Sequence, residues 1–219
     1  LAAAPESLKS ADTKPKASEY KFTMAVSPLD CMGCGECVTV CPTKAIEMKP
    51  QESQSEQQAA FDYCVENIRK KENIPGVVNE VSVKGSQFNQ PLLEFSGSCA
   101  GCAETSYARL ITQLFGEKMF ISNATGCSSI WGGTASISPY TTNKESGCGP
   151  AWINSLFEDN AEHGLGMQIG YETVRANLLK KVDALKGKSA ELDAAIEKFM
   201  GAKANTKQND APAKALIAA

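Results

Sequence analysis

Residues 31–42 read CMGCGECVTVCP, and they decide how the rest of the chain is interpreted. Their cysteines follow the spacing C-x2-C-x2-C-x3-C-P, which is typical of bacterial 4Fe-4S sites. Gly33 and Gly35 allow the backbone to curve around a cluster and to direct N–H groups at its sulfurs. A structural zinc site and a chance run of core cysteines are the alternatives, but zinc sites usually add a second cysteine pair about 12 to 20 residues downstream. No such pair follows Cys41, so the stretch predicts iron–sulfur ligation.

The four cysteines of this stretch do not complete one cluster among themselves. In two-cluster proteins with this motif, the fourth cysteine of each run binds the cluster of the other run. The first three cysteines then need a ligand from a second run, and Cys41 belongs to a cluster whose other ligands lie elsewhere. No cysteine precedes Cys31. We therefore interpret the chain as a segment cut from a longer polypeptide.

Cys64 offers an alternative fourth ligand for a single cluster. It lies on the apolar face of a helix predicted over residues 57–71, and a buried free thiol is the simpler interpretation. Cys148, in Gly-Cys-Gly-Pro, is a second alternative ligand that we interpret as a loop thiol.

A second group of cysteines lies in residues 95–132, FSGSCAGCAETSYARLITQLFGEKMFISNATGCSSIWG. Apolar residues recur at helical spacing over 107–114, and Gly116 ends the predicted helix. Thr105 or Ser106 is the predicted N-cap. The sequence therefore places a C-x2-C pair directly ahead of a helix.

The position of Cys99 and Cys102 favours an anionic cluster or lowered thiol pKa values, because the helix dipole and free N–H groups attract negative charge. An apolar stretch over 119–122 predicts a buried strand, and the loop over 123–129 delivers Cys127 toward the same place. A thioredoxin-like dithiol and half of a zinc ribbon share the C-x2-C spacing. The thioredoxin-like alternative expects no third remote cysteine, so Cys127 argues against it.

The composition excludes several classes of protein. The chain has 219 residues, 42% of them hydrophobic, which fits a globular protein of one or two domains. Its net charge of −3 provides neither a basic footprint for nucleic acid nor a cationic face for anionic lipid. No apolar run approaches the ~18 residues of a membrane-spanning helix, and the N-terminus lacks the pattern of a signal peptide. Nine cysteines, an odd number, favour metal or redox chemistry over complete disulfide pairing.

Four blocks of this sequence, in the same order, resemble the pyruvate:ferredoxin oxidoreductases (pyruvate synthases), thiamine-diphosphate enzymes that oxidise 2-oxoacids to acyl-coenzyme A. The resemblance covers residues of about 22 to 187. Its most specific blocks are the cysteine run at 31–42, CAGCAETSYARLITQLFG at 99–116, NATGCSSIWGG at 123–133 and GPAWINSLFEDNAEHGLGM at 149–167.

The resemblance implies a mixed α/β fold class: half of a two-cluster ferredoxin-like domain, followed by the first part of an α/β thiamine-diphosphate-binding domain. The domains that follow from it are a linker over 1–21, the second half of the ferredoxin-type 4Fe-4S domain over 22–72, a connector over 73–95, and the N-terminal part of the thiamine-diphosphate-binding domain over 96–219.

The resemblance also implies the cofactors and their ligands. The full enzyme holds three 4Fe-4S clusters, thiamine diphosphate and Mg. The second of the two cysteine runs of the ferredoxin-type domain is matched by Cys31, Cys34, Cys37 and Cys41. Cys99, Cys102 and Cys127 match three of the four ligands of the cluster nearest the thiamine, and the fourth lies beyond Ala219.

Two residues match thiamine-diphosphate contacts of the family: Glu104 through its side chain and Cys127 through its backbone. On the local pattern alone, Glu104 is a favourable acidic residue in a first helical turn. The Gly-Asp-Gly motif for Mg and diphosphate lies later in the family and is not present here, so Mg is bound mostly by residues outside this chain. Ala103 and Ser106 depart from the Gly and Pro usual in the family, which alters local geometry but removes no ligand.

The activity implied by the resemblance is oxidative decarboxylation of a 2-oxoacid, above all pyruvate, to acetyl-coenzyme A, with electrons passing through the clusters to ferredoxin or flavodoxin. The implied partners are that acceptor, pyruvate, coenzyme A, the remaining segments of the enzyme and a second copy in a homodimer, without nucleic acid or membrane. The implied location is the cytoplasm, or the hydrogenosome in an anaerobic protist. A non-enzymatic ferredoxin-type electron carrier with an appended domain, and a zinc-stabilised interaction module, are the contrasting functions.

The remaining predictions concern local structure. Strand or extended chain is expected over 74–95, a helix from Tyr171 to a stop at Gly187, a second helix over 192–199, and a weakly ordered tail after Gly201. His163 is expected to be a partly exposed residue near a helix end. Packing anchors are expected at the two tryptophans, Trp131 and Trp152.

Overall fold

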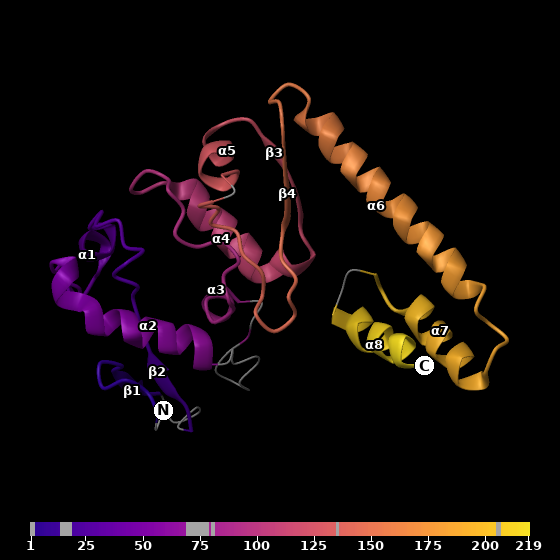
Figure 1. Cartoon of the computed structure of the whole chain (residues 1–219), viewed down its shortest axis with the longest axis horizontal. Helices are drawn as coiled ribbons and strands as arrows, with labels where there is room; N and C mark the ends of the chain where they lie inside the picture. Colours follow the sequence, from indigo (N-terminus) through magenta and orange to yellow (C-terminus); the bar gives the residue numbers. More distant parts are fainter. Residues whose placement is uncertain (1–2, 14–18, 69–78, 80–81, 135, 205–206) are drawn as a thin grey trace. The chain divides into compact units, whose positions relative to one another are not determined.

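The computed structural model of the chain combines helices with two short sheets, and Figure 1 labels these elements along the sequence. The chain falls into two compact units. Unit 1 comprises Leu1–Met119 and Cys127–Pro150, and unit 2 comprises Phe120–Gly126 and Ala151–Ala219. The structure describes residues 3–13, 19–68, 79, 82–134, 136–204 and 207–219. The mixed helix-and-sheet class that was predicted is therefore confirmed at this level.

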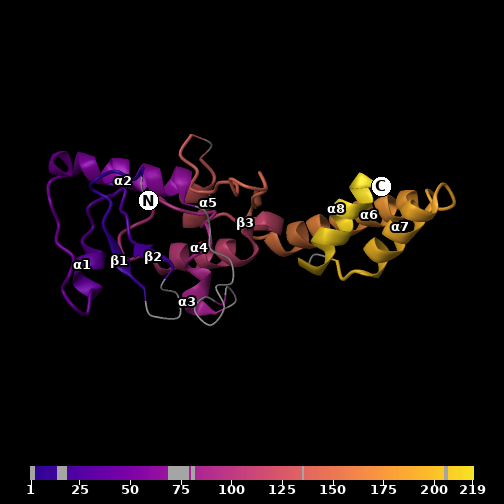
Figure 2. The ribbon, with the colours of Figure 1, turned by 90° about the horizontal axis from the view of Figure 1, so that it is seen from below.

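Unit 1 begins with two antiparallel strands, β1 (Ser10–Asp12) and β2 (Lys21–Thr23), which lie next to each other in both views (Figures 1 and 2). The prediction that residues 1–21 form only a linker is wrong for these strands. A contact that is remote in sequence explains the difference, because the ring of Phe22 packs edge-on against Phe88 with centroids 6.5 Å apart.

The ferredoxin-like part of unit 1 contains a short helix, α1 (Glu36–Val40), a 3-10 turn, η2 (Gln51–Gln54), and the helix α2 (Ser55–Asn67). The predicted helix at 57–71 is confirmed as far as Asn67, but Ile68 is already extended, and residues 69–71 lie outside the described residues. Ala60 is buried and Phe61 makes an edge-on ring contact with Phe95, with centroids 6.0 Å apart. This helix therefore connects the first cysteine run with the segment that carries the second C-x2-C pair.

The connector between these parts is more helical than predicted. The described part of residues 74–95 contains a single turn, α3 (Val83–Ser86), and one isolated antiparallel bridge between Leu93 and Tyr140. The hydroxyl of Ser82 accepts a 3.0 Å hydrogen bond from the N–H of Gly85, which caps this turn. At Val83, local capping thus prevails over β propensity.

The helix predicted around 107–114 is confirmed as α4 (Ala103–Phe115), followed by the 3-10 turn η3 (Gly116–Lys118). It starts earlier than the predicted caps, with Cys102 as its N-cap. The Thr105 and Ser106 hydroxyls instead donate hydrogen bonds of 3.1 and 2.8 Å to the carbonyls of Cys102 and Ala103. Neither hydroxyl therefore caps the helix.

Polar contacts hold the connector against the C-terminal half of α4. The Leu92 N–H donates to Thr112 Oγ1 at 3.2 Å, and the Leu92 side chain is 2% exposed. The side chain of Asn89 donates to the Gln113 carbonyl, and that of Gln113 donates to the Asn89 carbonyl, both at 3.0 Å. These contacts fix where the chain enters the segment with Cys99.

The last helix of unit 1 is α5 (Cys127–Gly132). The prediction of a loop over 123–129 is therefore wrong at Cys127, which opens a helix. Burial of Trp131 stabilises this short helix, because its ring packs against Tyr140 with centroids 6.2 Å apart. The prediction of Trp131 as a packing anchor is confirmed.

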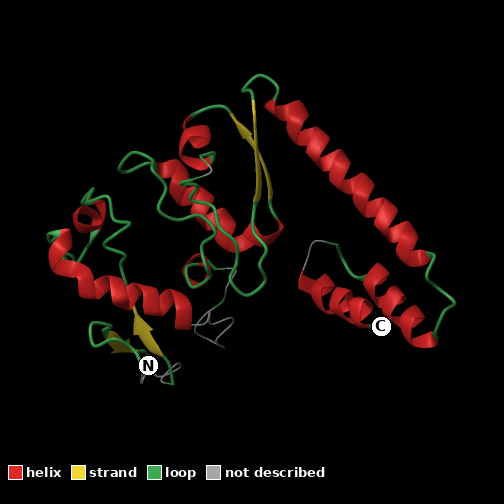
Figure 3. Cartoon of the chain, viewed as in Figure 1, coloured by secondary structure: helices red, strands yellow, loops and turns green. Residues whose placement is uncertain are grey.

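Unit 2 is built on a parallel pair of strands, β3 (Phe120–Ala124) and β4 (Ala151–Ser155), drawn in yellow in Figure 3. Phe120 pairs with Ala151 at one end and Ala124 with Ser155 at the other. The predicted strand at 119–122 is thus confirmed as a strand, but the prediction that it is buried is wrong, because Phe120 is 58% exposed.

The helix α6 (Asn160–Asp183) packs against β3 and begins earlier than the predicted start at Tyr171. A hydrogen bond of 2.7 Å joins Ser122 Oγ to His163 Nδ1, and the Phe120 and Tyr171 rings lie 5.5 Å apart. Contacts with the strand therefore stabilise the glycine-rich first turns, which have little apolar periodicity of their own. His163 is half-buried near the helix start, as predicted.

Unit 2 ends with α7 (Ala190–Gly201), the 3-10 turn η4 (Lys207–Asn209) and α8 (Asp210–Ala218). α7 confirms the helix predicted over 192–199; the Ser189 hydroxyl caps it by accepting from Leu192 N–H at 3.1 Å. Ile196 is fully buried. The prediction of a weakly ordered tail is wrong for α8, which packs against α7 (Figures 1 and 2). Across the described part of the chain, none of the helices combines the length and apolar character needed to span a bilayer.

Candidate iron–sulfur and cofactor sites

The first cysteine run, residues 31–41, begins at a hydrogen-bonded turn that is held against the helix α2. The Cys31 N–H donates to the Ser27 carbonyl at 3.1 Å, and the Ser27 hydroxyl donates to Asp30 Oδ2 at 2.5 Å. Ser27 is 2% exposed. The side-chain oxygen of Gln58, on α2, accepts the Leu29 N–H at 3.1 Å. The run is therefore anchored at its beginning on a regular helix.

Two glycines give the run its curvature. Gly33 and Gly35 have φ angles of +70° and +74°, a left-handed conformation that only glycine adopts without strain. The Gly35 carbonyl accepts the Val38 N–H at 3.1 Å and so starts α1. Cys34 and Cys37 are exposed on either side of this turn.

The environment of Cys41 fits a thiolate ligand. Its Sγ accepts a hydrogen bond from the Ala45 N–H at 3.3 Å and lies 3.6 Å from Thr43 Oγ1. These hydrogen bonds hold the pKa of the Cys41 thiol below its usual value. N–H groups directed at cysteine sulfur also tune the potential of iron–sulfur clusters, so the donor set here suits such a group.

The second cysteine segment, residues 94–102, closes with a tight turn. The Cys102 N–H donates to the Cys99 carbonyl at 3.1 Å, and Gly101 between them has a φ of +72°. The Cys102 side chain makes no capping hydrogen bond to α4, so its sulfur is available to a ligand. Cys99 and Cys127 are exposed.

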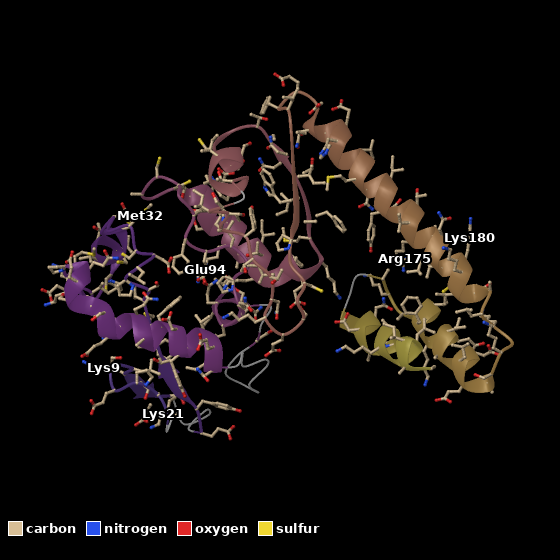
Figure 4. All side chains as sticks on the ribbon, in the orientation of Figure 1. Lys9, Lys21, Met32, Glu94, Arg175 and Lys180 are labelled. Carbon is tan, nitrogen blue, oxygen red and sulfur yellow. The ribbon has the colours of Figure 1, made fainter. Side chains whose placement is uncertain are left out.

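The first cysteine run and the second cysteine segment lie side by side in unit 1. A Cβ atom built on Gly101 would be 3.6 Å from Glu36 Oε1, so the Glu36 carboxylate packs on the Gly101 backbone. The Phe61–Phe95 ring contact holds the second cysteine segment against α2. Figure 4 labels one residue of each segment, Met32 and Glu94.

The cysteine sulfurs themselves are not gathered into a metal site. Over the residues that the structure describes, no three Cys, His, Asp or Glu side chains form a group that could hold a metal ion. All nine cysteines are free thiols. The assignment of seven of them as cluster ligands thus stays a prediction, supported by the backbone geometry of both segments.

The two remaining cysteines differ from these seven in their surroundings. Cys64 is half-buried on α2, and burial raises the pKa of its thiol, which disfavours a thiolate. Cys148 is exposed, and its Sγ lies 3.6 Å from the Ser146 carbonyl, within the same tight loop.

Glu104 lies exposed in the first turn of α4, and its charge acts on Tyr140. Burial, and after it the charge of Glu104, raises the pKa of the Tyr140 hydroxyl. The Tyr140 ring packs on Trp131, whose indole Nε1 is buried and has no hydrogen-bond partner in the described part of the chain. An unsatisfied buried donor costs about 1–3 kcal/mol, so this cluster fits a place where a polar group binds.

Sequence reasoning did not identify Tyr140 as part of this site. It lies in the sequence Ser-Pro-Tyr-Thr-Thr, which carries only a turn signal. The Leu93–Tyr140 bridge and the 3.1 Å hydrogen bond from the Thr141 N–H to the Leu92 carbonyl bring it to the second cysteine segment. No local pattern could have indicated that pairing.

An ion pair that the sequence also did not indicate lies beside the second segment. Arg109 Nη2 on α4 is 3.2 Å from Glu94 Oε1. Both residues line a pocket of about 270 Å³ together with Leu93, Phe95, Ser96, Thr105 and Ser106. Burial raises the pKa of the Glu94 carboxyl; the charge of Arg109 opposes this effect and that of Asp30 adds to it.

This raised pKa predicts a pH-dependent stability. Because the folded chain holds the Glu94 proton more tightly than the unfolded chain, the free energy of unfolding falls as the pH rises from about 5 to 7. The variant Glu94→Gln lacks this contribution, so we expect it to gain stability relative to the wild type over that range. Denaturant unfolding at both pH values measures the difference.

The matched control for this prediction is Glu117→Gln, an exposed position of η3 in the same unit. If the stability of Glu94→Gln relative to the wild type fell as the pH rises, the charge of Arg109 rather than burial would dominate the carboxyl. A difference that stays constant with pH would contradict a raised pKa, because the two effects would then cancel.

Comparison with known protein families identifies the first cysteine run. Residues 24–47 match the model of a 4Fe-4S binding domain. This match covers all four cysteines of the run and the two left-handed glycines.

Several curated proteins are similar over most of this chain. It is 55% identical over 170 residues, 77% of its length, to a pyruvate-flavodoxin oxidoreductase of Klebsiella pneumoniae. It is 49% identical over 209 residues, 93% of its length, to the pyruvate:ferredoxin oxidoreductase of Moorella thermoacetica. A pyruvate dehydrogenase [NADP(+)] of Cryptosporidium parvum is 52% identical over 159 residues, 72% of the chain. The matched parts span only 14%, 17% and 8% of those proteins.

Proposed function

We propose, from the premise that this chain belongs to the family of the pyruvate:ferredoxin and pyruvate-flavodoxin oxidoreductases, that it forms the electron-exit segment of such an enzyme. The reaction is the oxidative decarboxylation of a 2-oxoacid, pyruvate above all, to acetyl-coenzyme A. Residues 22–72 are the second half of a ferredoxin-type 4Fe-4S domain in this proposal. Residues 96–219 are the first part of a thiamine-diphosphate-binding domain.

One observation carries the proposal: the two cysteine-bearing segments pack directly against each other. The Glu36–Gly101 contact brings a residue of the 4Fe-4S match beside the second C-x2-C pair. The Phe61–Phe95 ring contact joins α2 to the segment that carries this pair. Electron transfer between clusters needs their ligand segments to be neighbours. A carrier with an unrelated appended domain has no need of this arrangement.

The chain's own residues would hold and tune the cofactors. Cys31, Cys34 and Cys37 would ligate one 4Fe-4S cluster, and Cys41 would ligate a second. Cys99, Cys102 and Cys127 would ligate a third, and Glu104 with the Cys127 backbone would contact thiamine diphosphate. When bound, that cofactor supplies the carbanion stabilisation that decarboxylation of a 2-oxoacid requires. Mg would be held mostly by residues outside this chain.

The proposed partners follow from the same family membership. Electrons leave to ferredoxin or flavodoxin, the acceptors in the names of two relatives, while the name of a third contains NADP(+). Coenzyme A receives the acyl group, and the remaining segments of the enzyme complete the clusters. The assembled enzyme is proposed to be a homodimer.

The direct test is an anaerobic assay of the full-length protein, reconstituted with iron, sulfide and thiamine diphosphate. We expect reduction of ferredoxin or flavodoxin that requires both pyruvate and coenzyme A. A protein that binds iron and accepts electrons, but neither binds thiamine diphosphate nor responds to any 2-oxoacid, would instead be a ferredoxin-type electron carrier.

The role of Glu104 is tested by Glu104→Gln in the full-length protein. We expect the variant to bind thiamine diphosphate about tenfold more weakly or worse, because a hydrogen bond to a charged group is lost. Titration calorimetry measures the affinity, and Glu117→Gln at the other end of α4 serves as the control. Unchanged affinity in Glu104→Gln would mean that this glutamate only stabilises the first turn of α4 and does not contact the cofactor.

A further inference from the structure

Glu36 is the side chain by which the two cysteine segments meet. It stands between Cys34 and Cys37, in the first turn of α1, and its carboxylate lies on the backbone of the Cys99–Cys102 turn. An ideal Cβ atom built on Gly101 would lie 3.6 Å from Glu36 Oε1 and 3.8 Å from Glu36 Cδ. Glu36 therefore lies beside the predicted ligands of two different clusters.

Gly101 makes this approach possible. Its φ of +72° turns the chain between Cys99 and Cys102, and its missing side chain leaves room for the carboxylate at van der Waals distance. A second contact holds the segment of Cys99 and Cys102 against α2, because Phe61 and Phe95 pack edge to face. The position of Glu36 is therefore part of the packing of unit 1.

No cation neutralises this carboxylate within the described part of the chain. Lys21, Lys49 and Arg109 of unit 1 instead form ion pairs with Asp12, Glu47 and Glu94. The charge of Glu36 is thus available to act on its surroundings. Reduction adds one negative charge to an iron–sulfur cluster, so a nearby carboxylate disfavours the reduced form.

We propose that Glu36 is a tuning residue that lowers the reduction potentials of the two clusters on either side of it, a role that rests on the function proposed above. Because the carboxylate acts on both clusters, it lowers their potentials together. The difference between the two reduction potentials then stays small, while both reduced clusters remain strong reductants toward the acceptor.

The test is Glu36→Gln in the full-length protein, followed by a potentiometric titration with electron paramagnetic resonance detection. We expect the midpoint potentials of both clusters to rise. At a fixed potential, the ratio of reduced to oxidised cluster should increase about tenfold, which is 59 mV for a one-electron couple. The iron content should match that of the wild type, and Glu36→Asp should keep the wild-type potentials. Glu117→Gln, remote from this contact on η3, is the control and should shift neither potential.

Three outcomes would overturn the proposal. Unchanged potentials in Glu36→Gln would show that the carboxylate does not act on the clusters, and a shift confined to one cluster would show that it does not act between them. Iron loss in Glu36→Gln would mean that the side chain is needed for assembly rather than for tuning. Each of these leaves the proposed function intact, whereas a wild-type protein that assembles no cluster would overturn both.

Discussion

Replacing Cys102 by alanine in the full-length protein is expected to remove the four irons of one cluster and to abolish pyruvate-dependent reduction of the acceptor. A thiolate ligand is lost, and alanine has no donor atom to replace it. The helix behind it should remain, because the Cys102 side chain makes no capping hydrogen bond to α4. Colorimetric iron analysis and electron paramagnetic resonance measure the loss.

The controls for this experiment are Cys64→Ala and Cys148→Ala. Both thiols are free, and neither belongs to the proposed ligand sets. Full iron content is expected in both variants. Equal iron loss in Cys64→Ala would favour the alternative in which Cys64 closes a single cluster, and full iron content in Cys102→Ala would contradict the ligand assignment.

The second large effect is expected for Leu92→Ala. This side chain is 2% exposed, and its Cδ1 fills the space that a Cβ on Gly116 would need, at 2.8 Å. Its backbone also joins Thr112 on α4 to Thr141. Truncation leaves a cavity at this junction, so we expect unit 1 to lose about 2–5 kcal/mol of stability.

The two tryptophans allow each unit to be followed separately. Trp131 belongs to unit 1 and Trp152 to unit 2, so Trp152→Phe leaves fluorescence from unit 1 alone. In the Trp152→Phe background, denaturant unfolding should show the loss of stability that Leu92→Ala causes. Leu165→Ala, an exposed position of α6, is the matched control and should change the unfolding of unit 1 little. Equal effects of the two variants would contradict a core role for Leu92.

Signals that are local in sequence were sufficient for much of the fold. The cysteine spacing at 31–42, the helical periodicity over 107–114 and 192–199, and the apolar stretch at 119–122 each lie within one element. The structure confirms α4, α7 and β3 for this reason. The family match at residues 24–47 likewise rests on a continuous motif.

Features that depend on distant partners were missed. The strand β2 depends on the contact between Phe22 and Phe88, and the early start of α6 depends on the bond from Ser122 to His163. The Glu36–Gly101 contact joins two motifs whose spacing says nothing about their relative positions. The candidate ligands and the glycines that curve the first run were therefore accessible from the sequence, whereas the contacts between distant segments were not.

The parallel pair β3–β4 has a consequence for how this chain behaves in solution. Among the described residues no third strand joins the pair, whereas parallel sheets occur almost only with both faces covered. Phe120 and Ile153 are 58% and 47% exposed. An open strand edge is a template on which another chain can add a strand. Purified alone, the chain is therefore prone to self-association through unit 2, and oligomers seen in that state report on the open sheet and not on the assembly of the enzyme.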